Sequence, residues 1–276
     1  MTEKKMDKNK QQMQGVADTL YIPLTARIYV SRRFPEYFYD EKSLSIEHAI
    51  PNDSIARNSN EYVQMASVAR YYNLDEMAKA FMAKHGRCNV INLGAGLETA
   101  YFRLKPNEAI FYEMDFPEVI AERRRVLGEA DNEILIPGDL FDLAWADGID
   151  TSLPSLLIVS GVFQYCHEEQ ILRFIDEVKE RFAQAELIFD ATNKRGLAYA
   201  NRYVRRTGNT NAMMHFSLDD GREFAAKSGT QFIAQRPFFT QARKMLRRKL
   251  NLYSRVAMWI SDEGPARSVL LHLKLH

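Results

Sequence analysis

The sequence predicts an α/β fold built on a doubly wound parallel sheet. Short apolar runs recur along the middle of the chain, and helical patterns lie between several of them. Continuous apolar runs are typical of strands buried on both faces, and alternation of strand and helix is typical of a parallel sheet. A third observation is the glycine turn Gly94-Ala95-Gly96 directly after the first strong strand, a position where such sheets bind ligands.

A helical segment precedes the sheet. Residues 1–14 are too polar to bury a face, and we expect a flexible tail there. Apolar residues with helical spacing follow from Val16 to Val30, and two helical patterns, broken near Asn73, run from Ser59 to His85. We therefore expect a helical cover over residues 15–86.

Five strands are expected in the core at residues 87–193, where the clearest helix, Glu168 to Phe182, carries one apolar stripe. After Asp190 the pattern loosens, and we expect an insertion at 194–218 and closing strands and helices at 219–276, so that 15–276 is one domain. The expected core strands are Asn89 to Leu93, Ala109 to Tyr112, Ile134 to Ile136, Leu156 to Val159 and Leu187 to Phe189. The later elements are a helix from Gly196 to Arg206, a strand-like Met213 to Leu218, a helix from Arg222 to Lys227, a strand from Gln231 to Phe239, a helix from Thr240 to Trp259 and a strand from Val269 to Leu275.

Composition excludes several classes of function. Lys and Arg number 37 against 36 for Asp and Glu, so no global field favours nucleic acid as a partner. The six histidines and two cysteines lack the short spacings of a metal site, and no metal is expected. No segment is apolar over the length of a bilayer, so we expect no membrane partner and a cytoplasmic location. The basic group from Arg243 to Lys249 is interpreted as a solvated helix face, and contact with phosphates is the alternative.

The glycine turn at Gly94-Ala95-Gly96 lets a ligand approach the backbone and exposes amide N–H groups. Thr99 stands where a dinucleotide fingerprint has glycine or alanine, so no close pyrophosphate seat is indicated. The turn therefore favours a mononucleoside over NAD. An ordinary strand-to-helix turn is the structural alternative.

Acidic residues follow the next two strands. Asp115, about 20 residues after the turn, can accept hydrogen bonds from both ribose hydroxyls, with Glu113 as the second choice. Asp139 and Leu140, after the third strand, are suited to the amino group and the flat face of adenine. The alternative for each aspartate is a helix N-cap.

These residues resemble the leucine carboxyl methyltransferase family, which includes polyketide O-methyltransferases of the tetracenomycin type. The matching stretches are VINLGAGLETAYFRL, FYEMDFPEVI, PGDLFD and LLIVSGVFQYCHEE, together with an arginine upstream of the turn. The resemblance implies a class I methyltransferase fold, which is Rossmann-like, with an N-terminal helical cover, an insertion after the fifth strand and S-adenosylmethionine as the cofactor.

The resemblance also implies residue roles. Arg70 would pair with the methionine carboxylate of the cofactor, since a planar guanidinium binds both oxygens, and Arg27 would join it from the N-terminal cover. Gly94 would contact the cofactor through its backbone, and the acids after the second and third strands would keep the roles given above. Ser160, at the end of the fourth strand, would border the methyl donor.

Two residues depart from the family pattern. Glu98 stands where the family has Asp, and Ser160 stands where it has a Glu that helps hold the cofactor's amino group. The second change removes a charge partner for an ammonium group, so Glu98 or Gln164 is a candidate to replace it. Tyr165 is the candidate to face the acceptor, and a packing role is its alternative.

The expected reaction is direct displacement, in which an acceptor oxygen attacks the sulfonium methyl. The resemblance implies a small molecule with a carboxylate or an acidic hydroxyl as the acceptor, which agrees with the absence of an evident general base and with the cationic insertion. Three alternatives stay open: a non-catalytic cofactor-binding module, a protein carboxyl methyltransferase, and an NAD-linked oxidoreductase that Thr99 disfavours. The cationic residues are Lys194, Arg195, Arg202, Arg205 and Arg206.

Overall fold

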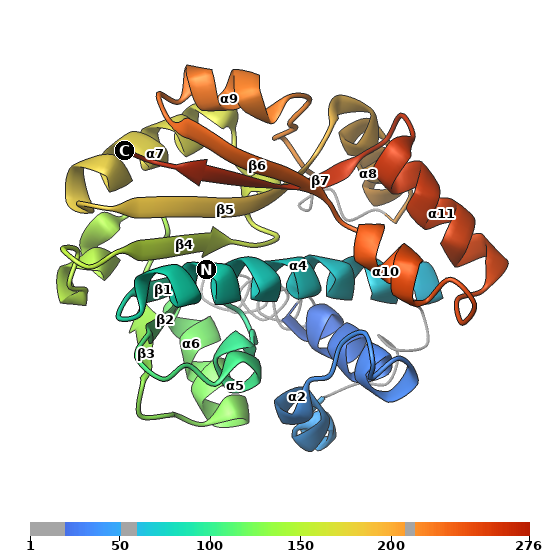
Figure 1. Ribbon diagram of the computed structural model, residues 1–276, viewed down its shortest axis with the longest axis horizontal. Coiled ribbons are helices and arrows are strands. Elements are labelled where there is room, and N and C mark those ends of the chain that lie inside the picture. The colour runs from blue at the N-terminus through green and yellow to red at the C-terminus, as the bar shows by residue number, and fades with distance from the viewer. Residues whose placement is uncertain (1–19, 51–59, 208–212) are drawn as a thin grey trace, which may run out of the picture.

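The computed structural model of the protein describes residues 20–50, 60–207 and 213–276. A seven-stranded sheet runs through the molecule in the order β3-β2-β1-β4-β5-β7-β6 (Figure 1). The pairs formed among β1 to β5 are all parallel, whereas β7 is antiparallel to both β5 and β6. The predicted doubly wound α/β sheet is confirmed, with one antiparallel strand added. The strands are β1 (Asn89–Leu93), β2 (Ile110–Asp115), β3 (Glu133–Pro137), β4 (Ser155–Val159), β5 (Ala185–Thr192), β6 (Gln231–Pro237) and β7 (Ser268–Lys274).

Helices cover both faces of the sheet. One face packs against α4 (Glu61–His85), a helix over residues 20–33, α10 (Thr240–Met245) and α11 (Leu252–Glu263). The other face packs against α7 (Glu168–Arg181) and α9 (Gly221–Lys227). The remaining helices are α2 (Glu41–Ser45), η1 (Glu47–Ala49), α5 (Ala100–Leu104), α6 (Pro117–Leu127), η2 (Leu143–Gly148), η3 (Phe163–Tyr165) and α8 (Lys194–Thr207).

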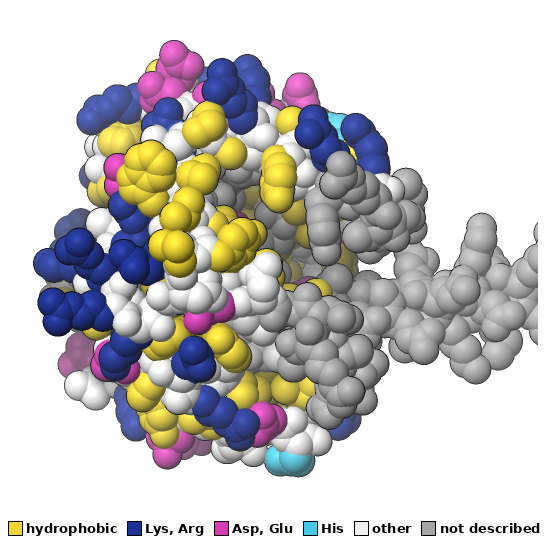
Figure 2. Space-filling view, turned by 90° about the vertical axis from the view of Figure 1, so that its right-hand side faces the viewer, with side chains coloured by type: hydrophobic (Ala, Val, Ile, Leu, Met, Phe, Trp, Pro, Cys, Tyr) yellow, Lys and Arg dark blue, Asp and Glu magenta, His cyan; other side chains and the backbone are white. Residues whose placement is uncertain are grey.

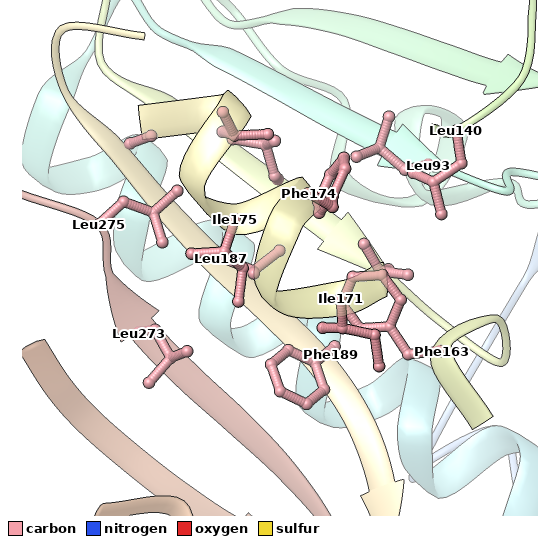
Figure 3. Close-up of a cluster of buried hydrophobic side chains, with 14 of the residues drawn as sticks. Leu93, Leu140, Phe163, Ile171, Phe174, Ile175, Leu187, Phe189, Leu273 and Leu275 are labelled. Atoms are coloured by element: carbon pink, nitrogen blue, oxygen red, sulfur yellow. The ribbon is translucent and has the colours of Figure 1, made fainter. Parts of the chain in front are cut away.

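Apolar strand residues build the two layers of core. β1 and β4 are buried at every position, as their continuous apolar sequence predicts. On the α7 face, Phe163 lies between Phe174 and Phe189, with ring centroids 5.8 and 5.2 Å away and the rings edge to face (Figure 3). Burying one such side chain contributes about 1.5–3 kcal/mol, so this cluster fixes α7 against the sheet.

The long helix α4 crosses one face of the sheet without interruption, so the predicted break near Asn73 is wrong. The amide of Asn73 donates to the carbonyl of Ala69 in the preceding turn, at 2.8 Å, and to the carbonyl of Phe238 after β6, at 2.9 Å. Its polar side chain therefore ties the helix to another segment while the backbone stays helical. This continuity carries Arg70 to the carboxyl ends of β4 and β5.

Two expectations in the C-terminal part are also wrong. Residues 213–218 form no strand, because their backbone bonds instead to Gln164 and Thr192 outside any ladder. The single helix expected from Thr240 to Trp259 is two helices, since the chain turns after α10 and begins α11 with Asn251 as its N-cap. The tail expected at residues 1–14 lies outside the described residues. No helix in the described part of the chain has the length and apolar character to cross a membrane.

Candidate cofactor site

The carboxyl ends of four neighbouring parallel strands meet at one edge of the sheet. Leu93, the last residue of β1, is paired with Met114 of β2 on one side and with Val159 of β4 on the other. Asp115 at the end of β2 is paired with Pro137 at the end of β3. The residues that directly follow these strands are therefore neighbours in space, as a single ligand site at this edge requires.

The turn after β1 needs glycine at its first position. Gly94 has φ +73°, and a Cβ atom there would lie 2.4 Å from Cγ2 of Val162. The backbone N–H groups of Gly94 and Ala95 donate to the carbonyl of Met114, at 2.9 and 3.0 Å. Gly96 also has positive φ, at +51°. The two hydrogen bonds to Met114 and the close approach of Val162 thus fix the turn in a backbone conformation that residues other than glycine rarely adopt.

Asp115 joins the end of β2 to the glycine turn. One carboxylate oxygen accepts the N–H of Gly96 at 2.8 Å, and the other accepts the N–H of Phe116 at 2.8 Å. Burial raises the pKa of Asp115, while the two N–H groups act against that shift. Each oxygen keeps a second lone pair, so the carboxylate can still accept ribose hydroxyls.

Glu113 does not share this position, and its choice as a second ribose ligand is wrong. Side chains alternate along a strand, so Glu113 and Asp115 point to the same face, but Glu113 lies deeper and is 0% exposed. It accepts a hydrogen bond from the amide of Asn92 at 3.0 Å and lies 3.5 Å from the guanidinium of Arg123. Its carboxylate therefore interacts with polar groups in the protein interior beneath the turn.

The two residues predicted to bind adenine, Asp139 and Leu140, follow β3, next to Asp115. The N–H of Gly138 donates to the carbonyl of Asp115 at 2.9 Å, which brings Asp139 to the same edge. Asp139 is exposed, and one of its oxygens accepts the N–H of Phe141 at 2.9 Å. Leu140 is 7% exposed and belongs mainly to the core.

Two exposed aromatic residues stand beside this acidic pair, and sequence reasoning missed both. Phe116 follows Asp115 and is 50% exposed, and Phe141 follows Leu140 and is 38% exposed. The face of an aromatic ring beside a carboxylate is suited to cover a flat base that the carboxylate binds. The signal was an aromatic residue placed directly after each motif.

Arg70 and Asp190 close the site at the ends of β4 and β5. Nη1 of Arg70 lies 3.2 Å from Asp190, whose other oxygen accepts the N–H of Gly161 at 2.5 Å. Gly161 has φ +75°, and a Cβ there would lie 3.0 Å from the guanidinium. Burial favours the neutral form of Arg70, but Asp190 outweighs it and the pKa of Arg70 is raised. Sequence reasoning missed Asp190, although an acid at a strand end is the same signal that singled out Asp115.

Two buried polar atoms at this end lack a partner among the described residues. They are Nε of Arg70 and the hydroxyl of Ser160. A small cavity of about 40 Å³ is lined by Gly94, Ala95 and Ser160, among others. Buried donors are normally satisfied, so these two fit a ligand that brings a carboxylate and further polar groups. The amino-acid part of S-adenosylmethionine has this chemistry.

Arg27 and Glu98 belong to an ion network behind the turn. Arg27 is 1% exposed, lies 3.0 Å from Asp40 and donates to the carbonyl of Leu97 at 2.5 Å. Glu98 lies 2.7 Å from Arg103, which also contacts Asp40 at 3.2 Å. Burial favours the neutral form of Glu98, but the two arginines outweigh it and lower its pKa. These contacts stabilise the turn, and the direct cofactor roles of Arg27 and Glu98 stay predictions.

The residue predicted to face the acceptor, Tyr165, lies in η3, which contacts the segment after α8. Tyr165 is 45% exposed at the end of η3. Next to it, the backbone N–H of His215 donates to the carbonyl of Gln164 at 2.7 Å, and the rings of His167 and His215 lie 4.4 Å apart. The described residues contain no group of three or more potential metal ligands. The facing role of Tyr165 stays a prediction.

The strand order and the edge just described define a class I methyltransferase fold. The structure is similar to a putative methyltransferase from Thermobifida fusca YX, with a TM-score of 0.57, 15% identity and coverage of 90% of this chain and 93% of that chain. It is also similar to magnesium protoporphyrin IX methyltransferase from Synechocystis PCC 6803, with a TM-score of 0.50, 15% identity and coverage of 85% and 94%. At such low identity these likenesses show the fold alone.

The sequence assigns the family. The profile of the leucine carboxyl methyltransferase family matches residues 23–179. The chain is 27% identical over 200 residues to the tetracenomycin polyketide synthesis O-methyltransferase TcmP of Streptomyces glaucescens, covering 71% of this chain and 74% of that protein. It is 27% identical over 180 residues to leucine carboxyl methyltransferase 1 of Rattus norvegicus, covering 52% and 53%. The chain belongs to the leucine carboxyl methyltransferase family and is an S-adenosylmethionine-dependent methyltransferase.

Proposed function

We propose that the protein transfers the methyl group of S-adenosylmethionine to an oxygen of a small-molecule acceptor that bears a carboxylate or an acidic hydroxyl. The observation that carries the proposal is the pair of unpartnered buried atoms at the end of the fourth strand, Nε of Arg70, which lies against Gly161, and Oγ of Ser160, which lines the cavity beside the glycine turn. They lie at the opposite end of the site from Asp139, so one extended nucleoside ligand accounts for the whole edge.

Each end of the cofactor has a set of residues suited to it. Arg70 and Ser160 would hold the amino-acid part, and the backbone of Gly94 would contact it. Asp115 would accept the ribose hydroxyls, with its carboxylate already oriented by the N–H of Gly96. Asp139 would accept the adenine amino group, and the ring faces of exposed aromatic neighbours would cover the base.

The cofactor itself supplies an activated methyl group, because its positively charged sulfonium leaves as the neutral thioether S-adenosylhomocysteine when the methyl–sulfur bond breaks. The protein then has to align the acceptor oxygen and exclude water. A carboxylate acceptor needs no proton removed, which fits a site whose strand ends supply acids already engaged in hydrogen bonds. Exposed cations on α8 at Arg195, Arg202 and Arg205 would attract an anionic acceptor.

A protein carboxylate is the second candidate acceptor, because relatives of the chain carry the name leucine carboxyl methyltransferase 1. Methyl-labelled donor incubated with the protein and a cell extract, followed by separation of small molecules from protein, distinguishes the two. We expect label in small-molecule O-methyl products, which are base-labile esters where the acceptor is a carboxylate and ethers where it is a hydroxyl. Label confined to protein supports the second candidate, and base-stable N-methyl products would refute transfer to oxygen.

A further inference from the structure

Helix α11 presents its apolar side chains to solvent. Four residues of the helix are buried, and three of them are polar, namely Ser254, Ser261 and Asp262. A surface helix normally shows the reverse arrangement, with an apolar stripe against the core. The exposed apolar residues are Leu252 (70% exposed), Tyr253 (62%), Val256 (48%), Trp259 (50%) and Ile260 (41%).

Cations without acidic partners surround this apolar stripe. Arg243 pairs with Glu263 at 2.6 Å, and Lys249 pairs with Glu36 at 2.6 Å. Other basic residues of α10, the following turn and α11 have no acidic partner in the described ranges: these are Lys244, Arg247, Arg248 and Arg255. Hydrophobic side chains gather beside Lys and Arg side chains on this side of the molecule (Figure 2). The basic group is mostly exposed, as the interpretation as a solvated face predicts, and it borders the apolar stripe.

A groove joins the two kinds of side chain. Its volume is about 280 Å³, and its lining combines three guanidinium groups with three apolar side chains. The lining residues are Arg243, Arg247, Leu252, Arg255, Val256 and Trp259. An arginine beside an apolar floor suits a phosphate group whose attached chain is apolar.

We propose that this α10–α11 surface, made of the exposed residues just named, docks the protein on an anionic phospholipid membrane. The guanidinium groups would bind lipid phosphates, and the apolar side chains of α11 would enter the headgroup region. Trp259 and Tyr253 are the residue types that favour this depth. The protein would contact the membrane at its surface only. This differs from the expectation, based on the sequence, that no membrane is a partner.

The geometry favours a membrane over two other occupants. In a symmetric contact between two copies, Arg247, Arg248 and Arg255 would face the same cations of the other copy, which is unfavourable. An acidic protein could pair with the cations, but it would need a hollow that matches a protruding helix. Because α11 lies along an outer edge of the molecule, a fluid bilayer can contact its whole length (Figure 1).

The test is sedimentation of the full-length protein with vesicles of phosphatidylcholine alone or with added phosphatidylglycerol. We expect binding to the anionic vesicles, which rising salt weakens. The fluorescence should shift to the blue on binding, because Trp259 is exposed while the other tryptophan, Trp145, is 3% exposed. Trp259→Phe should abolish this shift and keep most of the binding.

Two variants and two controls locate the contact. Val256→Glu and Arg247→Glu should each reduce binding at least about tenfold. Ile233→Glu and Lys274→Glu, which change exposed residues of β6 and β7, should leave it unchanged. Equal binding to neutral vesicles, or no binding to either kind, would overturn the proposal. So would self-association in solution that Val256→Glu abolishes. Methyl transfer is a separate readout, so this result is independent of the proposed function.

Discussion

The buried guanidinium of Arg123 on α6 donates to the carbonyl oxygen of Gly96, at 3.2 Å, while Asp115 accepts the N–H of the same glycine. Arg123 is 0% exposed and also donates to the carbonyl of Glu98 at 2.6 Å and to Glu133 at 2.5 Å. The carboxylate of Asp115 on β2 and the guanidinium of Arg123 on α6 therefore bind the N–H and the carbonyl of the same glycine and hold the turn in place.

Replacing Arg123 should cost both stability and cofactor affinity. Arg123→Met leaves the carboxylate of Glu133 buried without a cation, and we expect a loss of about 3–5 kcal/mol in the free energy of unfolding. The matched control is Arg124→Met, on the same helix, where the exposed pair with Glu129 contributes less than about 1 kcal/mol. Urea unfolding measures the free energy of unfolding of both variants. Equal losses would show that the buried Arg123 stabilises the protein no more than an exposed arginine does.

Glu113 gives the stability a specific pH dependence. Burial, aided by Glu133, raises the pKa of Glu113 to about 8 against the opposing effect of Arg123. The folded state then holds a proton that the unfolded state has lost, so this contribution is complete below the ordinary glutamate pKa and disappears as pH rises through 8. The free energy of unfolding should fall over that window by at most about 1.4 kcal/mol per pH unit.

Glu113→Gln should remove that slope, because the amide does not titrate. The control is Glu180→Gln, which changes an exposed residue of α7. The informative quantity is the difference in unfolding free energy between wild type and variant as a function of pH. A difference that stays constant between pH 5 and pH 8 would show that Glu113 is ionised in the folded protein.

Gly94 should tolerate no side chain. Gly94→Ala combines positive φ with a Cβ placed 2.4 Å from Val162, and we expect a loss of about 2–4 kcal/mol together with loss of cofactor binding. Gly229→Ala also has positive φ, but only the flexible end of Lys179 lies near it, so about 1–2 kcal/mol is expected. If Gly94→Ala with Val162→Ala binds no better than Gly94→Ala alone, the clash is not the cause.

Arg70 and Asp115 should be distinguishable by the ligand they act on. Arg70→Gln should weaken S-adenosylhomocysteine by about 1–3 kcal/mol and leave 5′-methylthioadenosine unchanged, because that ligand lacks the amino-acid part. Asp115→Asn should weaken both ligands, since both carry the ribose. Calorimetry with the two ligands measures this, and an Arg70 effect on both would place the arginine elsewhere.

The sequence predicted those parts of the site that depend on neighbours along the chain. The glycine turn and Asp115 directly follow strands, so a local pattern locates them. Asp190 lies 120 positions from Arg70, and only the fold brings the two together. Arg123 stands in a run of three arginines, yet it alone shares the helical stripe of Val119, Val126 and their neighbours.

The order of strands also has a consequence for the way the chain acquires its structure during synthesis. β6 is made before β7 and has no other neighbour in the sheet, and β5 likewise keeps an unpaired edge until residues 268–274 arrive. Exposed strand edges are prone to pair with other chains. A ribosome that pauses before the last strand would therefore hold two open edges at once, and nascent chains should depend most on chaperones at that point.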